Sequence, residues 1–290
     1  MLTNSGGKGL TLFWRMELMM GEDAICLERI REHLRQLVLQ TYGEEVRSPD
    51  AFKVATNLGI EYRPLPQEPS DKKRAAGSSI LSVRSEAPEE DWFVFLDQAT
   101  RIERQQFDLA HEIIEQYILD HPALLESAGH EAEELHPDDL LDQAHRLACY
   151  CVRDFLIDRK WLARDFEEVD GHLLKLKQLY PRASHELIAY ATLPLLGLGA
   201  ALTILDEPAG QPRRIYRRMR SDFRPIQEPL TVAERELAEA CFLTSEPQEA
   251  RCELQVEAWR FQGFAELRAY PVFEKKWRRV FVYLRAEEAD

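Results

Sequence analysis

The stretch FDLAHEIIEQYILDH, residues 107–121, decides what this chain can be. Its apolar side chains recur at the spacing of an α-helix, and His111 and Glu115 stand four residues apart. On a helix, residues four apart share a face with Cβ atoms roughly 5–6 Å apart, so this pair can hold one cation between them. Glu112 lies one position round the helix, where its carboxylate can contact a cation-bound water without ligating the cation.

Composition bounds the class of protein. The 290 residues are 45% hydrophobic and 30% charged, as in soluble globular proteins with one or two domains. The net charge of -14 disfavours duplex DNA as a partner of the whole surface, because phosphate binding needs cationic area. The five cysteines form no CxxC pair, which predicts free thiols in a reducing compartment. Without a long apolar run or a signal-peptide pattern, we expect a cytoplasmic protein with no membrane partner.

The N-terminal part of the chain alternates helical and β-prone patterns. We expect a loose tail over residues 1–22 and a domain over residues 23–195, which begins with two helices. Three short β-prone runs follow and predict a small sheet, at residues 60–65, 79–83 and 92–96. Thr100 and Glu103 match a capping box that would start the helix of His111.

A second long helix follows the first after an acidic loop. Pro122 ends the helix of His111, and Pro137 and Asp138 open the next one. Its apolar residues recur at helical spacing, at Leu141, Ala144, Ala148, Cys151, Val152 and Phe155. Cys149 and Cys151 are two apart and cannot share a helical face, so we interpret both as packing residues.

The last part of the chain predicts a separate α+β domain over residues 196–290. The composition shifts toward Gly, Pro and Leu near residues 194–210, which indicates a boundary. Beyond it we expect a helix capped by Thr231 and Glu234, and strands at residues 201–205, 251–259, 265–270 and 277–284.

The run ERQQFDLAHE, residues 103–112, closely resembles the ERQRFTLAHE that introduces the active-site helix of the ImmA/IrrE family of regulatory metallopeptidases. SPDAFKVATNLGIEYRPLP resembles the family's preceding helix and strand, and DQAHRLACYCVRDFLI resembles its second helix. The resemblance covers about residues 23–195. The C-terminal domain carries no motif of this family. Its position after the resembling region would make it the counterpart of the family's GAF-type sensor domain.

The resemblance implies a zincin-like α+β domain, a zinc ion, and cleavage of a helix-turn-helix repressor that frees stress or mobile-element genes. His111 matches the first histidine ligand, and Glu112 matches the catalytic base. Glu115 replaces the second histidine ligand, Leu141 stands at the usual glutamate ligand, and Ile114 replaces a glycine. Two of the three expected ligands have therefore changed.

His145 offers a repair of this ligand set. It lies one turn after Leu141 on the same stripe, so His111, Glu115 and His145 would restore two histidines and one carboxylate. Asp142 is the fallback third ligand if the alignment slips by one residue. Zinc with three protein ligands and an open position lowers the pKa of its water to about 7. The alternative role of His145 is that of a core histidine, hydrogen-bonded within the helix pair and not bound to a metal.

Three functions remain open from the sequence. The leading hypothesis is a regulatory zinc-dependent endopeptidase acting on a transcriptional repressor or similar protein. The alternative is a catalytically degenerate peptidase-like protein that works by binding, as a sensor or adaptor subunit, because two ligand identities are lost. The third is a transcriptional regulator, in which nucleic acid would contact the arginine-rich segment at residues 213–224.

The arginine-rich segment has two interpretations of its own. As a functional surface, it would dock a protein partner or an anion through Arg213, Arg214, Arg217 and Arg218. As a structural feature, it would be a solvated strand edge whose arginines pair with neighbouring carboxylates.

Overall fold

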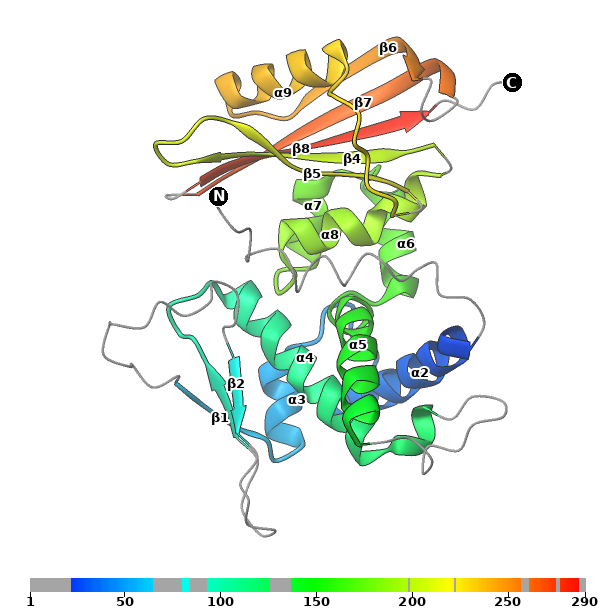
Figure 1. Ribbon diagram of the computed structural model, residues 1–290, viewed down its shortest axis with the longest axis vertical. Coiled ribbons are helices and arrows are strands. Elements are labelled where there is room, and N and C mark those ends of the chain that lie inside the picture. Colours follow the sequence, from blue (N-terminus) through cyan, green and yellow to red (C-terminus); the bar gives the residue numbers. More distant parts are fainter. Residues whose placement is uncertain are drawn as a thin grey trace. The chain divides into compact units, whose positions relative to one another are not determined.

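A computed structural model gives the fold over residues 22–64, 80–83, 93–125, 137–197, 199–221, 223–256, 261–274 and 277–286 (Figure 1). The expected tail, except Glu22, and the loop that carries His130 and His136 lie outside these residues. Contacts divide the chain into two compact units. The first runs to Leu162 and includes Leu179–Ser184; the second contains Ala163–Gln178 and His185–Asp290.

The described part of the first unit combines α-helices with a small sheet. Its helices are α2 (Glu22–Tyr42), α3 (Ala51–Asn57), α4 (Ile102–Asp120) and α5 (Pro137–Leu156). Its strands are β1 (Glu61–Pro64), β2 (Ile80–Val83) and β3 (Phe93–Leu96), in the order β1-β3-β2. β1 is parallel to β3, and β2 is antiparallel to it. These elements confirm the helices and the sheet that the sequence predicts in this region.

Helices α4 and α5 pack against each other, and α2 packs against α5 (Figure 1). Apolar side chains of α4 are almost fully buried, at Leu109, Ala110, Ile113, Ile114 and Ile118. The apolar stripe of α5 is buried as well, at Ala144, Leu147, Ala148, Cys151 and Val152, but Leu141, which the sequence places on the same stripe, is 48% exposed. Burying one large aliphatic side chain stabilises a fold by roughly 1.5–3 kcal/mol. The apolar residues that recur at helical spacing in the sequence are therefore the ones that hold this interface together.

A buried polar contact ties α3 to α4. Asp50 caps α3, because its Oδ1 accepts a hydrogen bond from Phe52 N at 3.0 Å. Gln106 of α4 donates from Nε2 to the same Asp50 oxygen at 2.8 Å, and its Oε1 accepts from Ala51 N at 2.8 Å. The start of α3 is thus held by a side chain of α4 five residues before His111.

The capping box predicted at Thr100 and Glu103 is wrong. The N-cap of α4 is Arg101, which makes no side-chain cap hydrogen bond. Thr100 Oγ1 instead donates to the carbonyl of Asp97 at 2.7 Å, in the turn that leaves β3. Competition by this local turn explains why the motif does not form, since a threonine hydroxyl serves either arrangement.

The second unit contains a five-stranded antiparallel sheet in the order β5-β4-β8-β7-β6. The strands are β4 (Ala201–Pro208), β5 (Arg214–Arg220), β6 (Gln248–Val256), β7 (Phe261–Glu274) and β8 (Trp277–Ala286). Helix α9 (Val232–Thr244) packs on one face of the sheet. The protein is therefore mixed α+β, as predicted, and none of its described helices combines the length and apolar character of a membrane span.

The predicted boundary between residues 195 and 196 does not match the division of the contacts. Helices α7 (Leu173–Leu179, all but its last residue) and α8 (His185–Thr192) belong to the unit of the sheet. Two contacts explain this: Glu186 Oε2 of α8 pairs with Arg279 Nη1 of β8 at 2.9 Å, and Thr192 Oγ1 lies 3.4 Å from Tyr283 Oη. The sequence also failed to predict α6 (Arg159–Glu168).

A buried ion pair fixes α9 to the sheet. Arg218 of β5 donates two hydrogen bonds to Glu234 of α9, at 2.8 and 2.9 Å, and the two side chains are 2% and 1% exposed. Arg218 also donates to Thr203 Oγ1 at 3.0 Å and to the carbonyl of Pro229 at 2.9 Å. Glu234 completes the predicted capping box with Thr231, which is confirmed. Both charges are thus fully hydrogen-bonded inside the protein.

We predict that Glu234→Gln destabilises the second unit by about 3–5 kcal/mol, because it leaves the buried guanidinium of Arg218 without a counter-charge. Glu236→Gln, at an exposed position of the same helix, is the matched control and should change stability by less than about 0.5 kcal/mol. Urea unfolding of both variants measures the difference. Equal unfolding midpoints would contradict this structural role of the pair.

Candidate metal centre

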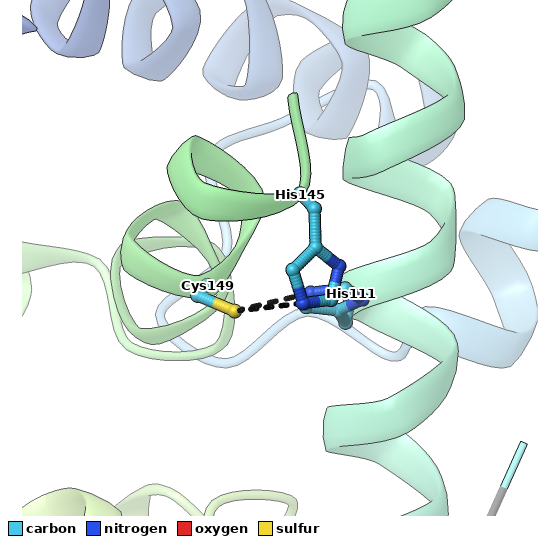
Figure 2. A group of neighbouring side chains, drawn as sticks. All are labelled: His111, His145 and Cys149. Atoms are coloured by element: carbon cyan, nitrogen blue, oxygen red, sulfur yellow. Dashed lines mark hydrogen bonds between the residues drawn. The ribbon is translucent and has the colours of Figure 1, made fainter. Parts of the chain in front are cut away.

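Five side chains with metal-binding chemistry meet where α4 faces α5. Helix α4 carries His111, Glu112 and Glu115, and helix α5 carries His145 and Cys149. His145 and Cys149 are four residues apart, so one face of α5 presents both. Figure 2 shows these two side chains pointing toward the ring of His111. The burial of the apolar residues beside them sets the helix faces that bring the five together.

The imidazoles and the thiol lie at close range. His111 Nε2 is 3.2 Å from Cys149 Sγ, and His145 Nε2 is 4.0 Å from the same sulfur (Figure 2). The two imidazole rings are edge to face, with centroids 4.7 Å apart and an interplanar angle of 68°. The Nε2 atoms of both histidines therefore face one sulfur atom.

The two carboxylates lie on the opposite side of the rings. Glu115 Oε2 accepts from His145 Nδ1 at 2.8 Å and lies 3.5 Å from His111 Nδ1. Glu112 Oε1 also lies 3.5 Å from His111 Nδ1. A carboxylate beside the second nitrogen of an imidazole is the usual arrangement around metal-ligating histidines, because it orients the ring and fixes the tautomer.

Electrostatic coupling shifts the titration of this cluster. Burial lowers the pKa of His111, but its contacts with Cys149 and Glu112 outweigh burial and raise that pKa to about 9. Contacts with Cys149 and Glu115 raise the pKa of His145 to about 10 against a smaller effect of burial. Burial raises the pKa of the Cys149 thiol, but the two histidines outweigh it and lower that pKa to about 7.

The donor set fits a transition-metal ion. Among the described residues, two groups of three have donor atoms within 4.8 Å of one another: His111 with His145 and Cys149, and His111 with Glu112 and Glu115. Imidazole, thiolate and carboxylate are the ligands of protein-bound zinc. His111 is 9% exposed at its side chain and His145 is 57% exposed, so the cluster is partly buried and open to solvent on the side of α5.

The structure brings together the residues that the sequence singled out. His111, Glu115 and His145 contact one another as expected, and Glu112 is adjacent. Asp142 is exposed and belongs to neither of the two groups found among the described residues, so the fallback ligand gains no support. The alternative for His145 is right in one part and wrong in the other: its ring is hydrogen-bonded within the helix pair, to Glu115 of α4, but its side chain is 57% exposed and does not lie in the core.

Sequence reasoning missed Cys149. We interpreted it as a packing residue, and the structure places its sulfur against both histidines. Cys151 is fully buried and keeps the packing role. The signal in the sequence is the spacing of His145 and Cys149, which are four residues apart and therefore share one face of the helix.

Three arginines of the arginine-rich segment pair with neighbouring acids. Arg218 is buried against Glu234 and is not available to an anion or partner, which corrects that part of the expected surface. Arg213 Nε lies 2.7 Å from Glu207 Oε1, and Arg214 Nη2 lies 3.5 Å from Asp206 Oδ2. These pairs favour the structural interpretation of the edge strand β5. Binding of a partner or nucleic acid by Arg213, Arg214 and Arg217 stays a prediction.

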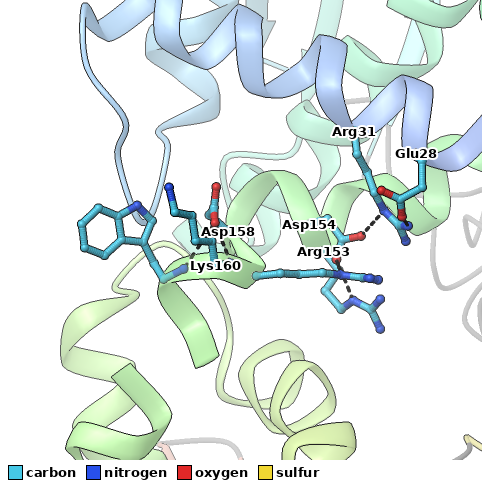
Figure 3. Close-up of polar contacts among 8 residues, drawn as sticks. Glu28, Arg31, Arg153, Asp154, Asp158 and Lys160 are labelled. Carbon is cyan, nitrogen blue, oxygen red and sulfur yellow. Dashed lines mark hydrogen bonds and ion pairs between the residues drawn. The ribbon is translucent and has the colours of Figure 1, made fainter. Parts of the chain in front are cut away.

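A second polar cluster lies between α2 and the end of α5, and Figure 3 shows its contacts. Residues of this region line a pocket of about 280 Å³. Asp154 lines this pocket and pairs with Arg31 at 2.6 Å, Arg159 at 2.9 Å and Arg153 at 3.2 Å. Burial raises the pKa of Asp154, but the arginines outweigh burial and lower it. These charges satisfy one another, so the cluster ties α2 to α5 and is not our candidate site.

No family model and no curated protein matches the chain. Several solved structures do match, among them a Mycobacterium tuberculosis transcriptional regulator with 12% sequence identity and a TM-score of 0.54. That match covers 95% of this chain and 80% of the regulator. At this identity the likeness shows a shared fold alone.

We predict that Cys149 in chelator-treated protein reacts with iodoacetamide at a rate that is half-maximal near pH 7, because its thiol pKa is lowered to about 7. A lowered thiol pKa means that the reactive thiolate persists down to that pH and is lost below it. Cys252 is the internal control, since burial raises its thiol pKa. Peptide mass spectrometry measures both rates, and identical pH profiles for the two cysteines would contradict the coupling.

Proposed function

We propose that the protein is a zinc-dependent regulatory endopeptidase whose first unit is zincin-like and acts on a helix-turn-helix repressor or a similar regulatory protein. The observation that carries the proposal is the convergence of His111 of α4 and His145 of α5, with acidic and thiol side chains against both rings. The resemblance of residues 103–112 to the ImmA/IrrE motif supports the same assignment.

The two histidines would hold the ion, and one further side chain would complete the protein ligands. Glu115 and Cys149 both touch the histidine rings, so either is within reach. When bound, zinc supplies a Lewis acid and makes a water molecule acidic enough to act near neutral pH. With three protein ligands, one coordination position would remain open for water or substrate.

Glu112 is the residue that would move protons. Its side chain is 15% exposed and projects beside His111, with Oε1 3.5 Å from Nδ1 of that ring. A carboxylate at this position can take a proton from the attacking water and return it to the amine of the leaving peptide. The exposure of His145 leaves the site accessible to an extended segment of a protein substrate.

The second unit would serve as the sensor of the protein. Its sheet has α9 on one face and α8 joined to β8, an α+β architecture compatible with the GAF-like domain that we expect from the resemblance. This part of the proposal rests on an analogy of fold and position.

A catalytically degenerate protein is the second candidate function. The observation in its favour is that Glu112 and Glu115 both lie against imidazole nitrogens, where they hold the rings in place. A site of this kind can bind an ion for structure alone, with no carboxylate left to act as base. The protein would then act on its partner by binding, as a sensor or adaptor subunit.

We predict that the purified protein contains zinc and cleaves the repressor encoded beside it, and that Glu112→Gln lowers the cleavage rate by about 10²–10⁴-fold. The amide cannot accept the proton, whereas zinc should still bind at saturating concentration because the substitution leaves the proposed ligands in place. Glu103→Gln, at the start of the same helix, is the matched control and should cleave normally. Intact-mass spectrometry of the repressor and elemental analysis of the protein give both readouts.

The same variants separate the two candidate functions. Zinc binding without cleavage, together with a biological response that survives Glu112→Gln, would favour the degenerate protein. Absence of both zinc and cleavage would contradict the endopeptidase.

A further inference from the structure

The identity of the third ligand follows from which nitrogen of each histidine is free. A neutral imidazole has one N–H donor and one lone pair, so a ring that donates from Nδ1 offers only Nε2 to a metal. His145 Nδ1 lies 2.8 Å from Glu115 Oε2, a hydrogen-bond distance. The nitrogen of His145 that remains for an ion is therefore Nε2, which faces Cys149.

Ligand-to-ligand distances distinguish a hydrogen bond from a shared ion. With Zn–N of about 2.0–2.1 Å and Zn–O of about 2.0–2.2 Å, two ligands of one tetrahedral ion lie roughly 3.4 Å apart. The 2.8 Å between His145 Nδ1 and Glu115 Oε2 is too short for such a pair. Glu115 and the Nδ1 of His145 are therefore partners in a hydrogen bond and not joint ligands.

The same arithmetic favours the thiol. With Zn–S of about 2.3 Å, a nitrogen and a sulfur on one tetrahedral ion lie roughly 3.6 Å apart. The distances from Cys149 Sγ to Nε2 of His111 and of His145 are 3.2 and 4.0 Å, which bracket this value. A shift of about 0.4 Å in each distance would seat an ion, and side-chain rotation alone supplies movements of that size.

We propose that this protein binds one divalent ion of the zinc class through His111 Nε2, His145 Nε2 and Cys149 Sγ, with Glu115 as the positioning residue of His145. The inference rests on the proposed function for the presence of an ion and adds the identity of the ligands. It gives α5 two ligands one helical turn apart and α4 a single ligand. A thiolate in the set selects zinc, cobalt or cadmium over magnesium or calcium.

The competing set of His111, Glu112 and Glu115 is less favourable. It would use Nδ1 of His111, which lies 3.5 Å from each carboxylate, and would bind the ion with one imidazole instead of two. In this set Glu115 would bind the ion instead of His145, so the 2.8 Å hydrogen bond between Glu115 and His145 would be lost. Two of its three donors are carboxylate oxygens, and such a set suits harder ions than zinc.

Cobalt substitution tests the assignment, because a thiolate ligand of Co²⁺ gives a charge-transfer band in the near ultraviolet that oxygen and nitrogen ligands do not give. The full chain is stripped with a chelator and titrated with Co²⁺, and one ion per chain with this band is the expected result. Cys149→Ser should bind Co²⁺ without the band and more weakly. Cys252→Ser, at a partly exposed thiol of β6, is the matched control and should keep the band unchanged.

Glu115→Gln separates a ligand from a positioning residue. As a positioning residue, Glu115 should leave the thiolate band in place when substituted, while the affinity for Co²⁺ falls by about 10–100-fold. Circular dichroism of each variant shows whether the helices remain folded.

Two results would overturn the assignment. If Co²⁺ binds without a thiolate band, or if Glu115→Gln abolishes binding while Cys149→Ser does not, Cys149 is not a ligand and the endopeptidase proposal still stands. If the wild-type chain binds neither Co²⁺ nor Zn²⁺, the ligand assignment and the proposed function both fail.

Discussion

The packing of α4 against α5 is the constraint on which the candidate site depends. Each helix buries an apolar stripe, and this packing holds the backbones that carry the polar residues at the edge of the stripes close together. His111 is carried by the same turns of α4 as the buried Leu109 and Ile113, and His145 lies beside the buried Ala144. The 3.2 Å approach of His111 to Cys149 is therefore a consequence of core packing and not of polar attraction alone.

Most of the fold was predictable because its elements carry strong local patterns. The periodicity of α2, α4 and α5, the alternating strands of the second unit and the Thr231 capping box all appear in the structure. The failures have non-local causes. Thr100 donates a hydrogen bond to the carbonyl of Asp97, in a turn that the local sequence pattern does not predict. Helix α8 is joined to the sheet by the contact of Glu186 with Arg279, two residues that are 93 positions apart in the sequence.

The site was predictable in part. The four-residue spacing on α4 and the stripe on α5 brought His111, Glu115 and His145 to one place, and their mutual contacts are those of neighbours in a cluster. The role of each atom was not predictable, because it depends on which ring nitrogen meets which partner. Cys149 was assigned to the core for the same reason: a thiol at helical spacing looks alike whether it packs or binds. The burial of Arg218 was equally hidden, since its partner Glu234 comes from another element.

Zinc-edge X-ray absorption spectroscopy of the zinc-loaded protein tests the account most directly, because it reports the atoms that surround the ion. The account predicts one sulfur at about 2.3 Å and at least two nitrogens at about 2.0–2.1 Å, and loss of the sulfur in Cys149→Ser. A shell made of nitrogen and oxygen alone would contradict the assignment of ligands. A protein that retains no zinc after gel filtration would contradict the existence of the metal site itself.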